Sequence, residues 1–214
     1  MKKTILISFL ALASSISAQI KPKYGLSAGL NISGFSGSDK PDGFSSKAGF
    51  HVGGFLWNYL SDKISIDAEL YYSQMGSKFE TTVPTIDNTT FTLTGKVKND
   101  YIRLPILFDY HPTEEFSIAL GPEIGVLLKN KVEYDKVING STTSNPKNVQ
   151  QFDVGLKAKV QYIFAKHYLA SVGYYFGMTK VYKNTTVYQQ NSILIQEAPK
   201  IYNANLGISV GYIF

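Results

Sequence analysis

The sequence predicts an all-β fold, an eight-stranded antiparallel up-and-down transmembrane β-barrel, on three observations. Apolar residues alternate with small or polar ones in eight segments, which is the period of a β-strand. The connections between these segments alternate between short and long, as in a barrel that crosses a membrane with an even number of strands. The second face of the segments is mostly Gly, Ser, Asn and Ala, which suits the filling of a narrow barrel better than a surface in water.

The chain begins with the three-part pattern of a secretory signal peptide, so we expect a signal peptide over residues 1–18 and an outer-membrane β-barrel over residues 19–214. Met1-Lys2-Lys3 is positive, residues 4–13 are almost wholly apolar, and Ile16-Ser17-Ala18 offers a cleavage site. The apolar stretch is too short to anchor the chain in a bilayer. An uncleaved N-terminal helix is the alternative. Cleavage would remove two lysines and no acidic residue, which lowers the formal net charge from +5 to +3.

Four strands are predicted in the first half of the chain. The first, residues 24–33, has this apolar face: Tyr24, Leu26, Ala28, Leu30 and Ile32. The second, residues 48–59, is rich in glycine and aromatic residues and alternates less cleanly. The third, residues 64–73, has this apolar face: Ile64, Ile66, Ala68, Leu70 and Tyr72. The fourth, residues 102–110, has this one: Ile102, Leu104, Ile106, Phe108 and Tyr110.

Four more strands are predicted in the second half. The fifth, residues 116–129, presents Phe116, Ile118, Leu120, Ile124, Val126 and Leu128, and places Lys129 on the opposite face. The sixth, residues 152–164, presents Phe152, Val154, Leu156, Ala158, Val160, Tyr162 and Phe164. The seventh, residues 168–177, presents Tyr168, Ala170, Val172, Tyr174 and Phe176. The eighth, residues 202–214, presents Tyr202, Ala204, Leu206, Ile208, Val210, Tyr212 and Phe214. Segments of about ten residues have the length that a tilted strand needs to cross a membrane.

The connections give the predicted barrel a direction. Three are tight turns, at residues 61–63, 112–115 and 165–167, which we expect on the periplasmic side. Four are long and rich in Ser, Thr, Asn and Lys, and we expect them outside the cell: residues 34–47, 75–98, 130–150 and 178–201. Threonine-rich stretches in these loops are predicted to extend hairpins above the membrane: Thr81–Val83, Thr89–Thr94 and Thr185–Tyr188.

A soluble, lipocalin-like barrel would show the same period, but its outer face would need many charges. Only 17% of the residues are charged, whereas 15 Tyr and 13 Phe are present. Aromatic residues gather near the turn-side ends of the strands: Tyr24, Tyr59, Tyr110, Phe116, Tyr162, Phe164, Tyr168, Tyr212 and Phe214. Others gather towards the loop-side ends: Tyr72, Phe152, Phe176 and Tyr202. This pattern indicates the two aromatic girdles of a membrane barrel, although Tyr and Phe also favour strands in general.

Four stretches resemble a known family: Tyr24–Asn31, Ile66–Gly76, Tyr101–Leu107 and Gly121–Leu128. They are similar to the outer-membrane β-barrel domain that is widespread in Bacteroidetes, the PorT-like family. Ala68 stands where that family usually has a proline before the glutamate of the third strand. The resemblance covers essentially the whole mature chain and implies a location in the bacterial cell outer membrane. One member of the family serves gliding and protein secretion. The C-terminal pattern that ends in Tyr212 and Phe214 resembles the signal read by the outer-membrane assembly machinery.

The charged residues on the small-residue faces are predicted to share the lumen of the barrel: Asp67, Glu69, Arg103, Asp109, Glu123, Asp153, Lys157 and Lys159. A buried charge destabilises the fold unless it is paired. We therefore expect a salt-bridge network centred on Glu69, Arg103, Glu123 and either Lys157 or Lys159. The network would plug and stiffen the barrel. The alternative is a gated polar path for small solutes.

Catalysis has little support in the sequence, and no catalytic residue, metal site or cofactor is expected. The absence of cysteine excludes disulfides, zinc–thiolate sites and cysteine nucleophiles, and no phosphate-binding loop or zinc-protease motif occurs. His111 and His167 fall at tight turns, where we expect them to be solvated, and His51 lies in a glycine-rich strand without a triad motif. Glu69 and Glu123 could form an acid–base pair, but the nearby cations favour structural ion pairs.

We therefore expect a non-enzymatic integral outer-membrane protein with a structural or surface-interaction role carried by its long loops. A small pore, or an accessory barrel of a secretion or gliding system, is the second hypothesis. A barrel-borne hydrolase or acyltransferase is the third. The expected partners are outer-membrane lipid, the assembly machinery and an extracellular protein or surface that contacts the loops. No nucleic acid is expected, because a net charge of +3 without a basic cluster gives no reason for one.

Overall fold

The computed structural model describes residues 22–84, 89–138, 141–189 and 192–214. The signal peptide expected over residues 1–18, with its cleavage site, lies outside these residues. Within the described ranges, the strands in chain order are β1 (Lys23–Ser36), β2 (Phe44–Ser61), β3 (Ile64–Pro84), β4 (Thr90–Tyr110), β5 (Phe116–Ile138), β6 (Ser141–Ser144), β7 (Phe152–Phe164), β8 (Tyr168–Lys180), β9 (Thr185–Gln189), β10 (Ser192–Gln196) and β11 (Tyr202–Ile213). No helix in this part of the chain is long and apolar enough to cross a membrane.

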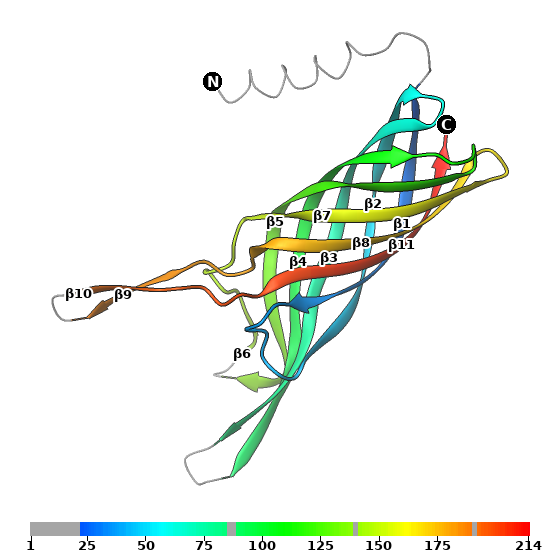
Figure 1. The fold of residues 1–214 in the computed structure, drawn as a ribbon. Helices are drawn as coiled ribbons and strands as arrows, with labels where there is room; N and C mark the ends of the chain where they lie inside the picture. The colour runs from blue at the N-terminus through cyan, green and yellow to red at the C-terminus, as the bar shows by residue number, and fades with distance from the viewer. Residues whose placement is uncertain (1–21, 85–88, 139–140, 190–191) are drawn as a thin grey trace.

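Eight of the described strands pair in one closed antiparallel ring, in the order β1, β2, β3, β4, β5, β7, β8 and β11 (Figure 1). The first and last strands close the ring, because Leu30 of β1 opposes Ile208 of β11. The predicted eight-stranded antiparallel barrel is therefore confirmed. β6 adds to the edge of β5, and β9 and β10 form a separate hairpin that points away from the ring (Figure 1).

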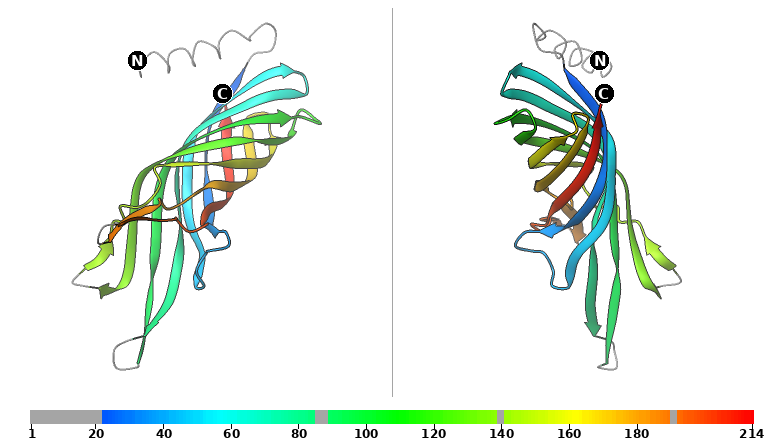
Figure 2. Two further views of the ribbon diagram at one scale, coloured as in Figure 1. Left: turned by 60° about the vertical axis from the view of Figure 1, so that its left-hand side comes forward. Right: turned by 90° about the vertical axis from the view of Figure 1, so that its right-hand side faces the viewer.

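The strands run farther on the loop side than the sequence suggested. Residues 75–98 were expected to form a loop, but β3 continues to Pro84 and β4 begins at Thr90, with Thr81 opposite Leu93. Figure 2 shows this hairpin projecting beyond the ring. Threonine and aromatic residues favour extended backbone even where one face is polar, which explains the extra length. The prediction that threonine-rich stretches extend hairpins is confirmed here and in β9–β10, where Thr186 opposes Ile195.

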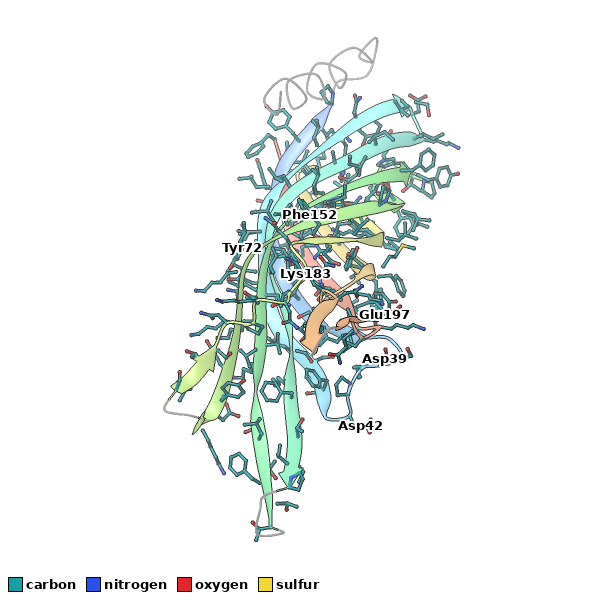
Figure 3. The ribbon with its side chains drawn as sticks, turned by 90° about the vertical axis from the view of Figure 1, so that its left-hand side faces the viewer. Asp39, Asp42, Tyr72, Phe152, Lys183 and Glu197 are labelled. Carbon is teal, nitrogen blue, oxygen red and sulfur yellow. The ribbon has the colours of Figure 1, made fainter. Side chains whose placement is uncertain are left out.

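The outer wall of the ring is apolar, and we call this surface the apolar belt. Leu30, Leu156 and Ile208 are exposed, and Ile208 keeps 52% of its surface accessible. At the turn end, rings follow one another around the wall, with centroids 5.6 Å apart for Tyr24–Phe214, Tyr212–Phe214 and Tyr168–Tyr212. Tyr72 and Phe152 lie on the loop side of this belt (Figure 3).

Two sequence-based placements are wrong. Tyr59 does not join the turn-side girdle, because its ring packs inside the barrel end, 5.1 Å from the ring of His111.

Lys129 does not face the lumen, although the sequence predicted that it would. A bulge in β5 makes Tyr101 oppose Leu127 while the preceding residue, Asp100, opposes Lys129, so Leu128 is an extra residue in the ladder. One extra residue in a strand exchanges the inward and outward positions of all the residues that follow it. Lys129 consequently lies exposed on the outer wall.

Side chains fill the lumen in three layers. The turn-side cluster consists of Phe55, Trp57, Ile163, Leu169 and Ile213. The loop-side cluster consists of Phe35, Phe79, Val97, Val181 and Ile201. Between them lies an ionic layer, made of Asp67, Glu69, Arg103, Asp109, Glu123, Asp153, Lys157 and Lys159. Apolar groups thus pack both ends of a barrel whose middle is polar.

Candidate functional site

The ionic layer is carried by one half of the ring. Its residues come from β3, β4, β5 and β7, where every second side chain points inward. The facing wall of β1, β8 and β11 bears small inward residues: Ser27, Ser171, Gly173, Gly207 and Ser209. Long charged side chains therefore extend across the lumen towards a wall that leaves them room. A cavity of about 30 Å³ remains between Glu69, Lys157 and this wall, which is enough space to hold water.

Arg103 is the centre of the loop-side half of the layer. Its Nε donates to Oε1 of Glu123, and its Nη1 lies 3.1 Å from Oδ2 of Asp153. The guanidinium is also stacked 4.0 Å from the ring centroid of Tyr175. Arg103 is 1% exposed and Glu123 is fully buried, so the charges compensate one another away from water. Opposite Arg103 on β5 lies Gly125, where a Cβ would come within 3.2 Å of Nη1.

Two lysines of β7 continue the network towards the turn side. Lys157 Nζ lies 2.9 Å from Oε2 of Glu69 and 3.5 Å from Oε2 of Glu123. Lys159 Nζ donates to carboxylate oxygens of both Glu69 and Asp67. Glu69 and Glu123 are thus joined through Lys157, and a continuous series of ion pairs runs from Asp153 to Asp67. The structure brings Glu69, Arg103 and Glu123 together with both lysines that the sequence analysis had offered as alternatives.

Neutral side chains that the sequence analysis did not single out complete the layer. The hydroxyl of Tyr71 donates to Oε2 of Glu123 at 2.8 Å. Gln161 Nε2 lies 3.0 Å from Oδ2 of Asp109 and 3.3 Å from Oδ2 of Asp67. Asn203 donates to Oδ2 of Asp153 at 3.0 Å. Alternation alone places these residues inward, but it does not say which carboxylate each one meets, because that depends on strand register.

The two inward histidines of the described chain, His51 and His111, are not arranged as members of a Ser–His–Asp triad. His111 was expected to be solvated, but it is buried beneath Trp57, with rings 6.0 Å apart. Ser65 Oγ and Asp109 Oδ2 lie 2.8 Å and 3.4 Å from the same atom, His111 Nε2. A Ser–His–Asp relay needs the serine and the carboxylate on opposite ring nitrogens. His51 Nδ1 is bonded to Asn31 Oδ1 at 2.8 Å.

The remaining predicted residues lie elsewhere. Tyr212 and Phe214 are exposed on the outer wall at the turn end. His167 is exposed, as expected for a turn, and its Nδ1 lies 2.9 Å from the carbonyl oxygen of Ile213. Among the described residues, no group of three or more His, Asp or Glu side chains is arranged to hold a metal ion. Arg103, Lys157 and Lys159 pair with four of the five carboxylates of the layer, and the fifth, Asp109, contacts Ser117, Gln161 and His111 instead.

Comparison with known proteins agrees with this geometry. The model of a family described as "Outer membrane protein beta-barrel domain" matches residues 16–183. Neisserial surface protein A, from Neisseria, has a similar solved structure, with a TM-score of 0.52 and 14% identity over 91% of this chain and 100% of that one. The attachment invasion locus protein of Yersinia pestis gives a TM-score of 0.50 and 14% identity, again over 91% and 100%. At this identity the two likenesses show the fold alone. No curated protein sequence matches the chain.

Proposed function

The chain belongs to the family of outer membrane protein beta-barrel domains, and from that premise we propose that it is a non-enzymatic protein with a structural or surface-interaction role. It is an integral protein of the bacterial outer membrane, in contact with membrane lipid. The long loop-side extensions carry any contact with an extracellular protein or surface. A cleaved signal peptide over residues 1–18 and recognition of Tyr212 and Phe214 by the outer-membrane assembly machinery are parts of the same proposal.

The observation that carries the proposal is the filled lumen. Apolar clusters pack both ends, and the ionic layer pairs its charges internally between them. In this proposal Glu69, Arg103, Glu123, Lys157 and Lys159 plug and stiffen the barrel. The hairpin of β3 and β4 meanwhile extends beyond the apolar belt, where another molecule can reach it. Contact outside the barrel is therefore favoured over passage through it.

The second candidate, a small pore, rests on the polar layer that crosses the lumen. Recording in planar bilayers distinguishes the two functions. The plugged barrel gives no reproducible channels. The doubly substituted Glu69→Gln, Lys157→Met protein lacks both charges at similar side-chain volume, and it should give channels if ion pairing holds the plug. Reproducible conductance from the unaltered protein would overturn the plug and support the pore.

The third candidate, a barrel-borne hydrolase or acyltransferase, has no support from the histidine geometry described above. If the purified protein were found to hydrolyse an ester or to transfer an acyl group, the non-enzymatic proposal would fall. Retention of that activity by the His51→Ala variant would further exclude His51 as its catalyst.

We also propose a narrower family for this chain. The stretches Tyr24–Asn31, Tyr101–Leu107 and Gly121–Leu128 support membership of the PorT-like barrels of Bacteroidetes, and with it an accessory role in secretion or gliding as the alternative function. Secretion and gliding assays on cells that lack the protein test this role. Unchanged secretion and motility would remove it.

The direction of the barrel in the membrane has its own test. The chain contains no cysteine, so a single introduced cysteine is the only thiol that a maleimide can label. Thr82 lies exposed on the β3 extension and Glu114 lies exposed in a tight turn. A membrane-impermeant maleimide should label Thr82→Cys on intact cells and Glu114→Cys only after the outer membrane is opened. Labelling of Glu114→Cys alone on intact cells would contradict the proposed orientation.

A further inference from the structure

Five lysines gather on the outer wall of β3, β4 and β5, immediately beyond the apolar belt on the loop side. We call this group the lysine band: Lys78, Lys96, Lys98, Lys129 and Lys131. The strand register places them side by side. Lys78 of β3 directly opposes Lys96 of β4, and Lys98 of β4 directly opposes Lys131 of β5. Lys98 and Lys131 keep 41% and 33% of their side chains accessible.

The band is continuous with the surface that faces the acyl chains. On β4 the outward residues Leu104 and Ile102 belong to the belt, and Ile102 opposes Tyr72 of the loop-side girdle. The next outward positions are Asp100, Lys98 and Lys96. At about 3.3 Å per residue and a tilt of about 40°, Lys98 lies about 10 Å above Ile102. A flexible lysine stem brings its ammonium group back towards the headgroup region from that height.

The band carries more positive charge than its acidic neighbours neutralise. Glu133 lies 2.6 Å from Lys98 Nζ and 3.2 Å from Lys131 Nζ, so one carboxylate serves two lysines. The hydrogen bond from Lys98 is the main reason that the pKa of Glu133 is lowered. Asp100 opposes Lys129. Glu80 follows Lys78 on the same face of β3.

One pair in the band makes no ion pair within the described part of the chain. Lys78 and Lys96 are directly opposed, and Glu133, which opposes Lys96 from β5, makes its ion pairs with Lys98 and Lys131 instead. Like charges that face each other across a sheet destabilise it unless an anion lies between them. The band therefore presents a site for a group with negative charge, and Lys98 lies next to it along β4.

We propose that the lysine band binds the phosphate groups of lipids in the leaflet that surrounds the loop side of the barrel. A lipid satisfies two features at once, because its acyl chains pack on Ile102 and Leu104 while its phosphate meets the ammonium groups above them. Lysine is a common phosphate ligand that acts as a point charge. A soluble polyanion would reach the lysines but would make no use of the belt below them. The proposal rests on the membrane orientation proposed above.

The test uses the full-length mature protein in detergent micelles with lipid A, a phosphorylated glycolipid, as the probe. The variant is Lys78→Gln, Lys96→Gln, Lys98→Gln. The control removes three exposed lysines from the turn end: Lys23→Gln, Lys63→Gln, Lys166→Gln. Native mass spectrometry measures the retained lipid. The band variant should retain at least tenfold less than the unaltered protein, and the control should match the unaltered protein. Dephosphorylated lipid A should bind all three equally weakly.

Three outcomes would overturn the proposal. Equal retention by the band variant and the unaltered protein would show that the band does not bind the lipid, and the same loss in the turn-end control would show a general charge effect. Displacement of the lipid by inorganic phosphate at equal concentration would reassign the band to free anions. Unchanged thermal unfolding of both variants controls for the fold. The cysteine labelling described above fails or succeeds independently of lipid retention, so an error in orientation is distinguished from an error in the site.

Discussion

Replacement of Arg103 by methionine removes the guanidinium from the middle of the ionic layer and leaves an unbranched apolar side chain about the length of the arginine stem. Glu123 loses its closer charged partner and retains Lys157 at 3.5 Å and the Tyr71 hydroxyl at 2.8 Å. Asp153 loses the ion pair at 3.1 Å and retains Asn203. Removal of one partner of a buried ion pair destabilises a protein by about 3–5 kcal/mol. Because each carboxylate keeps another donor, we expect the lower end, about 3 kcal/mol.

The assay is the free energy of unfolding from urea titration of the protein in lipid vesicles. The matched control is Lys98→Met, which breaks a 2.6 Å ion pair with Glu133 on the exposed outer wall. Exposed pairs contribute about 1 kcal/mol or less, so this variant should stay near the unaltered protein. The double variant Arg103→Met, Glu123→Gln should recover part of the loss, because one buried charge is then neutral. A loss in Arg103→Met no larger than in Lys98→Met would refute the reasoning.

Two further predictions concern the wall and the loops. Arginine in place of Ile208, in the middle of the apolar belt, should destabilise the folded barrel by about 2–4 kcal/mol, whereas Thr82→Arg beyond the belt should change the unfolding free energy by about 0.5 kcal/mol or less. Urea titration in vesicles measures both, and equal effects would contradict a lipid-facing wall. Asp39 accepts hydrogen bonds from the backbone N–H of Lys200 and the hydroxyl of Ser38, each at 2.8 Å, and these bonds hold its pKa below the ordinary value of 3.8. Since the folded pKa is the lower one, this contact stabilises the loops above pH 3.8 and is lost as the pH falls through the folded pKa. An NMR titration of the Lys200 amide should therefore show a midpoint below 3.8 that disappears in Asp39→Asn, and a midpoint at or above 3.8 would count against the contact.

The faces of the strands could be read from the sequence because a strand has a period of two residues. Arg103 and Glu69 each stand between apolar neighbours that face lipid, so their inward position follows from alternation alone. Their meeting in one layer follows less directly, since it requires the register of β3, β4, β5 and β7. Because the lumen of eight strands is narrow, opposite charges inside it are expected to pair. The prediction needed only one of Lys157 and Lys159, whereas both form ion pairs with Glu69.

The errors arose where the period fails or where an element ends. One extra residue at Leu128 turns Lys129 outward, and the sequence has no glycine or proline at that position that would predict a bulge. Tyr59 and His111 lie at strand ends, where an aromatic ring can turn into the barrel as readily as onto its wall. The β3–β4 hairpin is longer than the prediction because its outward residues are polar, and a polar stretch of sequence is equally typical of a loop.

The side of the wall that contacts acyl chains can be measured with one fluorophore at a time. The chain has a single tryptophan, Trp57, which is fully buried in the turn-side cluster. A second protein carries Trp57→Phe together with Ile208→Trp and so has its only indole on the outer wall. In vesicles of brominated lipid, the indole at position 208 should be strongly quenched and Trp57 should keep its emission. Strong quenching of Trp57, or access of aqueous acrylamide to position 208 without quenching by brominated lipid, would contradict the inward and outward faces on which the account depends.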